Sequence, residues 1–212
     1  MAMAHVNPTR MELKKLKGRL TTARRGHKLL KDKRDELMRR FLLAVRENKE
    51  LREHVEKELE AINRSFSAAA ATTDPRFLRE ALAIPKKRAE LKVSYANTMS
   101  VTVPVFQADI LSTGTEGEPG YGLAFTSGEL DEAVAALSRL LPELILLAER
   151  EKTALLLAEE IERTRRRVNA LEYIMIPQYE TEIKRISMKL DENERGNTTR
   201  LMKLKDLILV DR

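Results

Sequence analysis

The densest group of chemically versatile side chains lies between Arg163 and Arg167, where four of five residues are arginine. Their chemistry is charge pairing with carboxylates. Successive residues of a helix point in different directions, so Arg165, Arg166 and Arg167 spread around a helix and do not line one face. We expect one or two of these arginines to pair with glutamates of a facing helix, which leaves the others available to a partner.

Two other patterns resemble parts of known motifs but lack the residues that would complete them. Gly117 to Gly122 has the glycine spacing of a phosphate-binding P-loop, yet Leu123-Ala124 follows where lysine and serine or threonine are required. A surface loop is therefore predicted there. His54 and Glu58 can share one helix face, but no third ligand and no HExxH pattern accompany them. We interpret them as an ordinary exposed ion pair.

The composition excludes several kinds of catalytic or metal site. The 212 residues include no cysteine and three scattered histidines, which rules out a thiol nucleophile, a disulfide framework and cysteine-ligated zinc. Carboxylates are abundant, but a catalytic pKa requires burial or a like-charged neighbour in a cleft, and two-stranded coiled coils have no cleft. The chain is therefore predicted to be non-catalytic, with no metal site and no cofactor.

Composition also bounds the fold. The chain has 39 Lys and Arg against 33 Asp and Glu, no tryptophan, and only nine Phe and Tyr. Such a charge-dense, aromatic-poor chain favours long helices over a sandwich, a barrel or a parallel sheet. No apolar run approaches the length of a membrane span, and the first ten residues lack an apolar signal core. We therefore expect a cytoplasmic protein with no direct insertion into the membrane.

Positive charge is concentrated near the amino end. The net charge is +6, yet residues 10–46 contain fourteen Lys and Arg against four Asp and Glu, a local charge of +10. Such a basic arm is compatible with nucleic acid, an acidic membrane surface or an acidic protein as the partner. A solvated helix face that binds nothing explains the same pattern equally well.

Glycine and proline divide the chain into two helical arms around an irregular middle. Residues 9–74 contain no proline and two glycines, whereas five of the eight glycines lie between Gly114 and Gly128. Clusters of these residues mark loops. We predict a first coiled-coil helix at residues 10–66, a middle insertion at 67–126 and a second coiled-coil helix at 127–209.

A heptad pattern runs through the first arm. From Leu13 to Ile62, eleven of the fifteen positions spaced alternately by three and four residues are apolar. A repeat sustained over seven heptads predicts a left-handed coiled coil, in which His27, Arg34 and Asn48 are polar interruptions that fix the register. The predicted seam of the two arms includes Leu13, Leu16, Leu20, Leu30, Leu37, Phe41, Ile183, Ile186, Leu190 and Leu204.

The middle insertion carries its own signals. Asp74-Pro75 ends the first arm, and a short helix is predicted at residues 76–83. Leu91 to Val105 then alternates at period two around Ala96-Asn97-Thr98, which predicts a β-hairpin.

The second arm is expected to begin with Ser127 as its N-cap. Pro142 and Pro177 lie inside it, and each should kink the helix or free a carbonyl four residues earlier. Asp191 to Arg200 contains no large apolar side chain. That stretch is either a solvated tip or a polar contact zone for a surrounding protein.

Two long helices of one chain can satisfy both seams by folding back on each other. The predicted fold is therefore dominated by α-helix: a long antiparallel two-helix coiled coil with a small middle insertion that contains a β-hairpin. If Leu13 lies near Ile208, the residue numbers of opposed positions sum to roughly 221. His27 would then lie in the neighbourhood of Glu194 and Asn197.

Four segments carry a resemblance that covers essentially the whole chain. They are VNPTRMELKKLKGRL at residues 6–20, GHKLLKDKRDEL at 26–37, RTRRRVNALEYIMIP at 163–177 and MKLDENERGNTTRLMKLK at 188–205. In these segments the sequence closely resembles the D subunit of the V-type rotary ATPases, or ATP synthases, in its bacterial form.

The resemblance implies a central rotor axle. In that family the paired terminal helices enter a hexamer of alternating catalytic A and B subunits, and the F subunit clasps the axle. A funnel-shaped component, called d or C, couples the axle to the ion-translocating ring in the membrane. The axle would thus transmit torque from the cytoplasmic side, peripheral to the membrane, while other subunits bind the nucleotide.

A torque shaft should carry charge that can engage several stator positions in turn. Weak exchangeable contacts suit such a surface better than a buried hot spot, which would hold one angular position. The candidate partner contacts are Lys28, Lys31, Lys33 and Arg34 on the first arm and Arg165, Arg166 and Arg167 on the second.

A different class of function is a basic coiled-coil protein that binds nucleic acid or serves as an adaptor. The local charge of +10 supports it, but aromatic stacking platforms are missing. Salt separates the two hypotheses, because binding through many phosphates weakens steeply as salt rises. The rotor hypothesis predicts no nucleic-acid partner.

Overall fold

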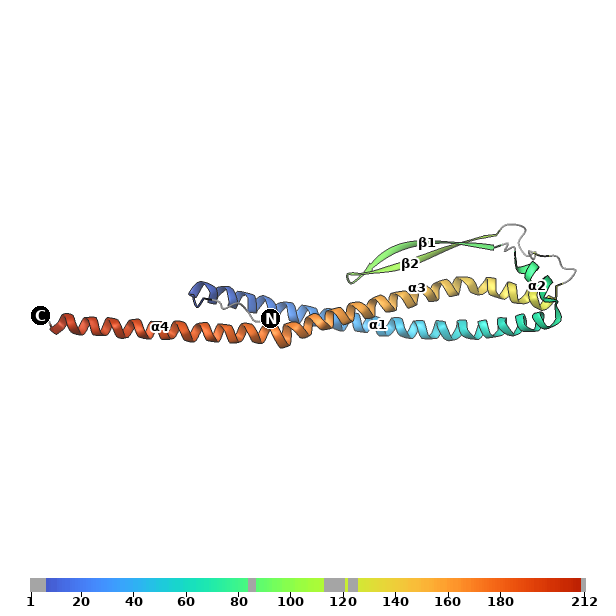
Figure 1. Cartoon of the computed structure of the whole chain (residues 1–212). Helices are drawn as coiled ribbons and strands as arrows, with labels where there is room; N and C mark the ends of the chain where they lie inside the picture. The colour runs from blue at the N-terminus through green and yellow to red at the C-terminus, as the bar shows by residue number, and fades with distance from the viewer. Residues whose placement is uncertain (1–6, 84–86, 113–120, 122–125, 211–212) are drawn as a thin grey trace. The chain divides into compact units, whose positions relative to one another are not determined.

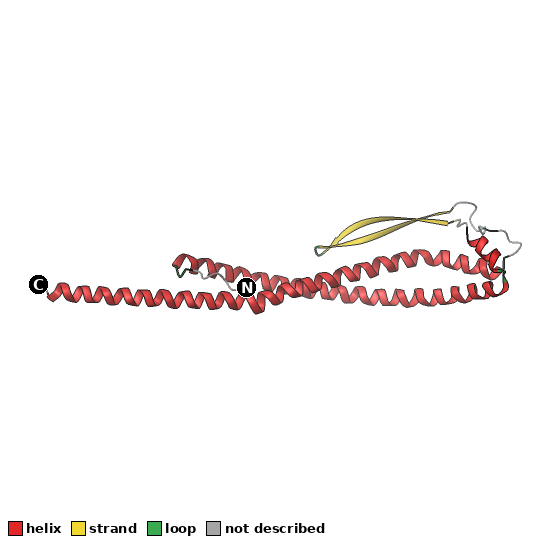
Figure 2. Cartoon of the chain, viewed as in Figure 1, coloured by secondary structure: helices red, strands yellow, loops and turns green. Residues whose placement is uncertain are grey.

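The computed structural model describes residues 7–83, 87–112, 121 and 126–210, and most of these residues are helical (Figures 1 and 2). Along the chain, helix α1 (Arg10–Thr72) is followed by helix α2 (Pro75–Leu82), strands β1 (Lys87–Thr98) and β2 (Val101–Ser112), helix α3 (Gly128–Ala170), the π-helical turn η2 (Leu171–Met175) and helix α4 (Ile176–Val210). The predicted fold class, long helices with a small β-hairpin between them, is confirmed. Helix α1 runs six residues past the predicted end at residue 66.

The chain divides into two compact units. Unit 1 comprises Met1–Glu36 and Ile161–Arg212, and unit 2 comprises Leu37–Glu160. In each unit a stretch of α1 packs along a later helix of the opposite direction, and the apolar side chains between the two helices form the core. Among the described residues, no helix combines the length and the apolarity needed to cross a membrane.

The core of unit 1 is centred on Leu16 of α1 and on Tyr179 and Ile186 of α4, all of which are buried. Partly buried hydrophobic side chains packed against these three are Leu13, Leu20, Ala23, Ile183 and Leu190. Burying one such side chain stabilises a fold by about 1.5–3 kcal/mol. This packing, more than helix propensity, therefore stabilises the paired helices.

The register of the helices in unit 1 differs from the predicted one. Arg10 forms an ion pair with Glu194, so the residue numbers of opposed positions sum to 204 at this pair. The prediction that Leu13 faces Ile208 is therefore wrong. It assumed that the seam continues across the polar stretch of α4, whereas α1 begins at Arg10 and has no earlier turn to lie against the end of α4.

Two residues change their expected surroundings with this register. His27 lies beside Glu172, with Nε2 3.4 Å from Oε2, and not in the neighbourhood of Glu194. Leu204, predicted as a seam residue, is 54% exposed and lies outside the seam. All side chains of residues 191–207 are exposed, including Glu194, which Arg10 at the start of α1 contacts.

A π-helical turn separates α3 from α4. Ile176 donates its N–H to the carbonyl of Leu171, five residues earlier, so the turn holds one residue more than an α-helical turn. As a result, Leu171, Met175 and Tyr179 follow one another at intervals of four and all three reach the α1 side of the helix. Pro177 comes directly after the turn, and its lack of an N–H explains why the α-helical ladder is interrupted here.

The core of unit 2 consists of Val55 and Ile62 of α1 and Ala133 and Leu140 of α3. Between Val55 and Ile62 the seam passes through Leu59, which packs on this core, whereas strict alternation predicted Glu58. Glu58 is exposed. A step of four followed by a step of three keeps the apolar side chain inside and the carboxylate in water.

The helix ends of unit 2 are capped differently from one another. Asp74 caps α2, since its Oδ1 accepts the N–H of Arg76 at 2.8 Å and Pro75 occupies the first turn. Ser127 precedes α3, but its Oγ has no hydrogen-bond partner among the described residues, and its carbonyl accepts the N–H of Leu130 instead. The prediction that Ser127 caps the helix through its side chain is wrong.

Strands β1 and β2 form an antiparallel hairpin of two twelve-residue strands. Thr98 pairs with Val101, so the connection is the two-residue loop Met99-Ser100, with φ of 53° and 69°. Positive φ at both positions is the geometry of a type I′ turn. The predicted turn at residues 96–98 is wrong, because those residues belong to β1 and the sequence lacks the glycine that usually marks this turn.

Candidate functional site: the charged faces of the paired helices

The basic residues predicted as partner contacts on α1 differ in their surroundings. Lys28 and Lys31 are exposed, one turn apart, and neither forms an ion pair with a described residue. Lys33 is half-buried and interacts within the chain. Arg34 donates from Nε and Nη2 to Oδ1 of Asp35, at 3.0 and 2.7 Å. Lys28 and Lys31 are therefore the pair that presents unpaired charge to solvent.

The three arginines predicted on the second arm lie between two buried residues of α3. Thr164 and Val168 point into the packed side of the helix, and residues 165–167 between them are exposed. Arg166 forms an ion pair with Glu162, one turn earlier on the same helix. Arg165 and Arg167 form no ion pair with a described residue. Their guanidinium groups are thus open to an acidic partner.

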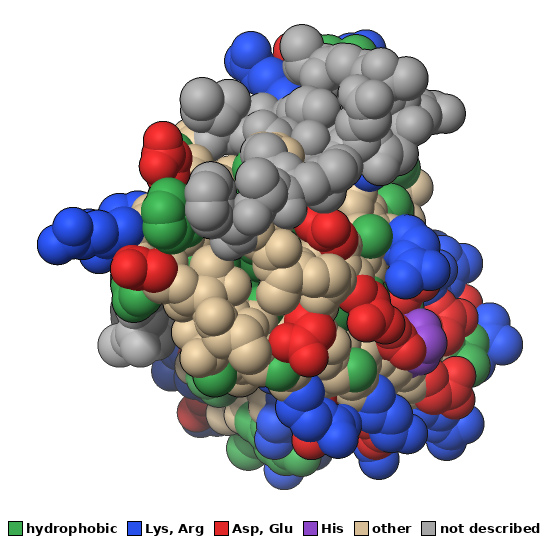
Figure 3. Space-filling model, turned by 90° about the vertical axis from the view of Figure 1, so that its right-hand side faces the viewer, with side chains coloured by type: hydrophobic (Ala, Val, Ile, Leu, Met, Phe, Trp, Pro, Cys, Tyr) green, Lys and Arg blue, Asp and Glu red, His purple; other side chains and the backbone are tan. Residues whose placement is uncertain are grey.

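Acidic and basic side chains are interspersed on the face of the molecule that Figure 3 shows. Interhelical ion pairs occur in both units. In unit 1 they join Arg10 to Glu194, Arg24 to Glu180 at 2.6 Å and His27 to Glu172 at 3.4 Å. In unit 2 they join Arg150 to Glu47, and Arg52 to Glu151 and His54 to Glu143, both at 3.4 Å. The hydrogen bond from Arg52 to Glu56, together with the charges of Glu56 and Glu151, raises the pKa of Arg52. Exposed pairs of this kind contribute little to stability, because water and salt screen them.

His54 forms its ion pair with a different carboxylate from the predicted Glu58. Its Nε2 lies 3.4 Å from Oε2 of Glu143 on the facing helix, so the ion pair crosses the coiled coil and does not involve Glu58. Within the described residues, no three His, Asp or Glu side chains gather as metal ligands would. The glycine-rich segment at residues 117–122 lies outside the described residues except for Tyr121.

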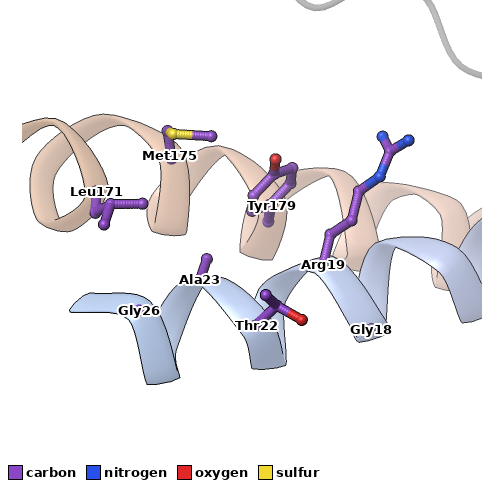
Figure 4. A pocket seen from close by; sticks show the side chains of 8 residues that line it. All are labelled: Gly18, Arg19, Thr22, Ala23, Gly26, Leu171, Met175 and Tyr179. Carbon is purple, nitrogen blue, oxygen red and sulfur yellow. The ribbon is translucent and has the colours of Figure 1, made fainter. Parts of the chain in front are cut away.

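Sequence reasoning missed a groove in unit 1 (Figure 4). It is open, measures about 600 Å³, and its lining residues are Gly18, Arg19, Thr22, Ala23, Gly26, Leu171, Met175 and Tyr179. Small side chains on α1 leave the space, and the extra residue of η2 sets the larger side chains around it. The signals in the sequence were Pro177 and the successive steps of four through Leu171, Met175 and Tyr179, which depart from the heptad.

The hairpin is attached to α3 through polar contacts. The backbone N–H of Phe106 in β2 donates to Oε2 of Glu149 at 2.7 Å, and Lys87 of β1 donates to the hydroxyl of Ser138. Nearby, the Tyr121 hydroxyl donates to Oδ1 of Asp131 at 2.6 Å. Burial, this hydrogen bond and the negative charge of Asp131 raise the pKa of Tyr121 above its ordinary value.

These features define a coiled-coil protein that offers charged helical faces and a β-hairpin for contact. The family model for the ATP synthase D subunit matches residues 12–206, which is most of the chain. This chain therefore belongs to the ATP synthase D subunit family.

Individual relatives agree with the family assignment. The chain is 58% identical over 209 residues to the V-type ATP synthase D subunit of Acetivibrio thermocellus, covering 99% of this chain and 94% of the relative. It is 57% identical over 208 residues to the protein of the same name from Clostridium botulinum (strain ATCC 19397 / Type A), with coverage of 96% and 95%. The corresponding protein of Clostridioides difficile (strain 630) is 56% identical over 209 residues, with coverage of 99% and 94%.

Proposed function

We propose that this chain is the central-stalk rotor shaft of a V-type ATPase or ATP synthase, and that it transmits torque without being catalytic itself. The observation that carries the proposal is the similarity along nearly the full length to proteins named as the D subunit of V-type ATP synthases. In this role the chain connects the catalytic A/B hexamer to the ion-translocating ring of the membrane. It is a cytoplasmic, peripheral component of the complex.

The difference in net charge between the two units supports different partner contacts for each. Unit 1 contains 23 Lys and Arg against 13 Asp and Glu, a net charge of +10, whereas unit 2 contains 16 against 20, a net charge of −4. The basic unit is suited to an acidic surface that surrounds it. We assign unit 1 to the contact with the A and B subunits, through Lys28, Lys31, Arg165 and Arg167.

Unpaired, exposed cations suit a turning shaft. Each contact with a carboxylate of the hexamer contributes about 1 kcal/mol or less, so that contacts exchange without holding one angle. Lys33, Arg34 and Arg166 have partners within the chain and act as a second group of contacts that must first exchange those partners. The F subunit and the funnel-shaped d, or C, subunit complete the set of proposed partners.

The test replaces the arginines of α3 in the reconstituted complex. Single substitutions Arg165→Ala, Arg166→Ala and Arg167→Ala should each reduce ATP turnover only modestly, since each removes about 1 kcal/mol or less and other contacts remain. Replacing all three by Glu should lower assembly or torque much further, because the local field is reversed. Turnover, rotation and copurification with the A, B and F subunits are measured.

Two controls keep the result interpretable. Helicity by circular dichroism should be unchanged in every variant, and Arg64→Glu, an exposed reversal in unit 2, should leave turnover close to the wild-type value. If one alanine substitution abolishes turnover in a folded, assembled complex, a single specific contact carries the coupling and the distributed bearing is wrong. Tight binding of duplex DNA at physiological salt, with no copurification of the A, B or F subunits, would favour the nucleic-acid hypothesis instead.

A further inference from the structure

Strand β1 has one edge that no described element covers. Its residues from Lys87 to Asn97 are all exposed. The apolar side chains Leu91, Val93 and Tyr95 alternate along it and are 49%, 46% and 72% exposed. An exposed strand edge of this length is a template for pairing with another strand.

The hairpin itself shows which backbone groups point outward from β1. The backbone N–H of Phe106 donates to Glu149, so this N–H points away from β1. Two residues earlier in β2, Pro104 has the same orientation and has no N–H to donate. Val93 and Tyr95 lie directly opposite Phe106 and Pro104 in the hairpin. In an antiparallel pair, two opposed residues either bond to each other or both point their backbone N–H and C=O groups away from each other, so those of Val93 and Tyr95 point outward from the hairpin. The odd-numbered residues of β1 therefore present N–H and C=O groups, for which no described residue is a hydrogen-bond partner.

The charges of β1 restrict which strand can pair with that edge. Arg88, Glu90 and Lys92 share one face of the sheet, at alternate positions. In an antiparallel pair of two β1 strands centred on Leu91, Glu90 of each strand lies opposite Lys92 of the other. In a register centred on Glu90, Glu90 lies opposite Glu90 of the other strand and Arg88 lies opposite Lys92. In a register centred on Lys92, Lys92 lies opposite Lys92 of the other strand. Like charges directly opposite are destabilising.

We propose that the free chain associates with a second copy of itself through β1, in the antiparallel register centred on Leu91. Nine residues of each strand, Lys87 to Tyr95, then pair and build a four-stranded sheet across a twofold axis. Outward N–H and C=O groups of Ala89, Leu91 and Val93 find partners, Leu91 meets Leu91 of the second copy, and two Glu90–Lys92 pairs form on the opposite face. The contact is small, so association is weak and depends on concentration.

The experiment is sedimentation velocity of the full-length chain over a range of concentrations. The wild-type mass should rise from one chain toward two with concentration. Glu90→Lys should weaken association by about tenfold or more, because both pairs become Lys–Lys. The control Glu53→Lys, an equal charge change at an exposed site of α1, should leave association unchanged.

A mixing experiment tests the register. In the wild type, Lys92 contacts Asp109 at 2.7 Å within the hairpin. A chain with Lys92→Glu and Asp109→Lys keeps an opposite-charge pair at this place. In a homodimer of this variant, however, Glu90 of each strand lies opposite the new Glu at position 92 of the other. This chain alone should be monomeric, and mixing it with the Glu90→Lys chain should restore dimers, since both interstrand pairs are then of opposite charge. Val93→Pro removes an outward N–H without touching the β1–β2 ladder and should abolish association with the hairpin intact.

Several results would overturn the proposal. They are a monomer at every concentration, dimers that persist in Glu90→Lys or Val93→Pro, or equal loss in Glu53→Lys. Failure of the mixture to dimerise while both variants keep wild-type circular dichroism would reject the register. None of these outcomes depends on the role of the chain in an ATP synthase, because only the free chain is used.

Discussion

Thr164 is a buried polar residue of α3 that lies between the buried apolar residues Ile161 and Val168. Its side chain is 1% exposed and its Oγ1 has no hydrogen-bond partner among the described residues. A hydroxyl buried without a partner costs about 1–3 kcal/mol. Valine has nearly the same shape and no hydroxyl, so it should fit the same space.

Thr164→Val should therefore raise the free energy of unfolding by about 1 kcal/mol, measured by urea denaturation. Thr164→Ser keeps the hydroxyl and loses the methyl group, and should lower stability by about 1 kcal/mol. A destabilised valine variant would mean that the hydroxyl has a partner in solution.

Ionisation of the Tyr121 hydroxyl should make the free energy of unfolding depend on pH in the alkaline range. Burial and the hydrogen bond to Asp131 raise its pKa in the folded protein above the ordinary value of 10.0. A group whose pKa is raised by folding binds its proton more tightly in the folded state. Its contribution to stability is complete below pH 10.0 and is lost as the pH rises further.

We expect Tyr121→Phe to be less stable than the wild type at neutral pH. The difference in the free energy of unfolding should shrink as the pH rises above 10.0, because ionisation of the wild-type phenol removes the advantage. Urea denaturation of both proteins over this range checks the expectation. A constant difference would show that the hydroxyl keeps its proton or does not contribute.

At the scale of elements, the helices and the hairpin were predictable because each has a clear period. Leu16 and Ile186 lie in heptad patterns and are buried, and Leu91 to Val105 alternates and forms parts of both strands with the two-residue loop between them. The exposure of Arg165 follows from its place next to a seam position. The register was not predictable, since heptads match equally well after a shift, and only the ends of α1 decide which turns of α4 are covered.

Other features depended on backbone geometry that has no strong signature in the sequence. The loop Met99-Ser100 has positive φ at two residues that rarely adopt it, so composition favoured a different turn. The side chain of Ser127 forms no hydrogen bond with the helix end among the described residues, although its residue type favours such a cap. The ion pair between Arg34 and the neighbouring Asp35 depends on the side-chain rotamer of Arg34, which the sequence does not specify.

The observed register can be tested with paired cysteines in this naturally cysteine-free chain. Leu16 and Ile186 pack in the same core cluster, so Leu16→Cys with Ile186→Cys should form an intramolecular disulfide under mild oxidation. Leu16→Cys with Lys205→Cys, which a register summing to roughly 221 would join, should remain unbridged. Peptide mapping identifies the links, and a bridge from residue 16 to residue 205 would contradict the observed register.

At the scale of the whole molecule, the two units differ in net charge. Unit 1 carries +10 and unit 2 carries −4. Electrostatic attraction accelerates association mainly by steering, and salt screens it over about 10 Å at 0.1 M ionic strength.

If the chain has the proposed role of rotor shaft, the rate at which it assembles with the A/B hexamer should fall several-fold as salt rises from about 50 to 200 mM, with a smaller change in the dissociation rate. Stopped-flow fluorescence with a labelled chain measures both rates. The triple Glu variant of residues 165–167 should show a shallower salt dependence. An association rate that does not respond to salt would show that the positive charge of unit 1 does not steer assembly.

The π-helical turn has a consequence for insertions and deletions. The turn absorbs its extra residue locally, so that the side chains that follow, from Tyr179 to Leu190, keep their packing against α1. Removing one residue within Leu171–Met175 would convert the turn to α-helix and leave Ile186 in the core. Removing one residue of α4 between Tyr179 and Ile186, where no bulge absorbs the change, would instead rotate the side chains that follow by about 100° around the axis. Adding or removing a residue after Leu190 would shift only exposed side chains among residues 191–207. One-residue deletions should therefore be tolerated within η2 and near the carboxyl end of α4, and selected against between Tyr179 and Leu190.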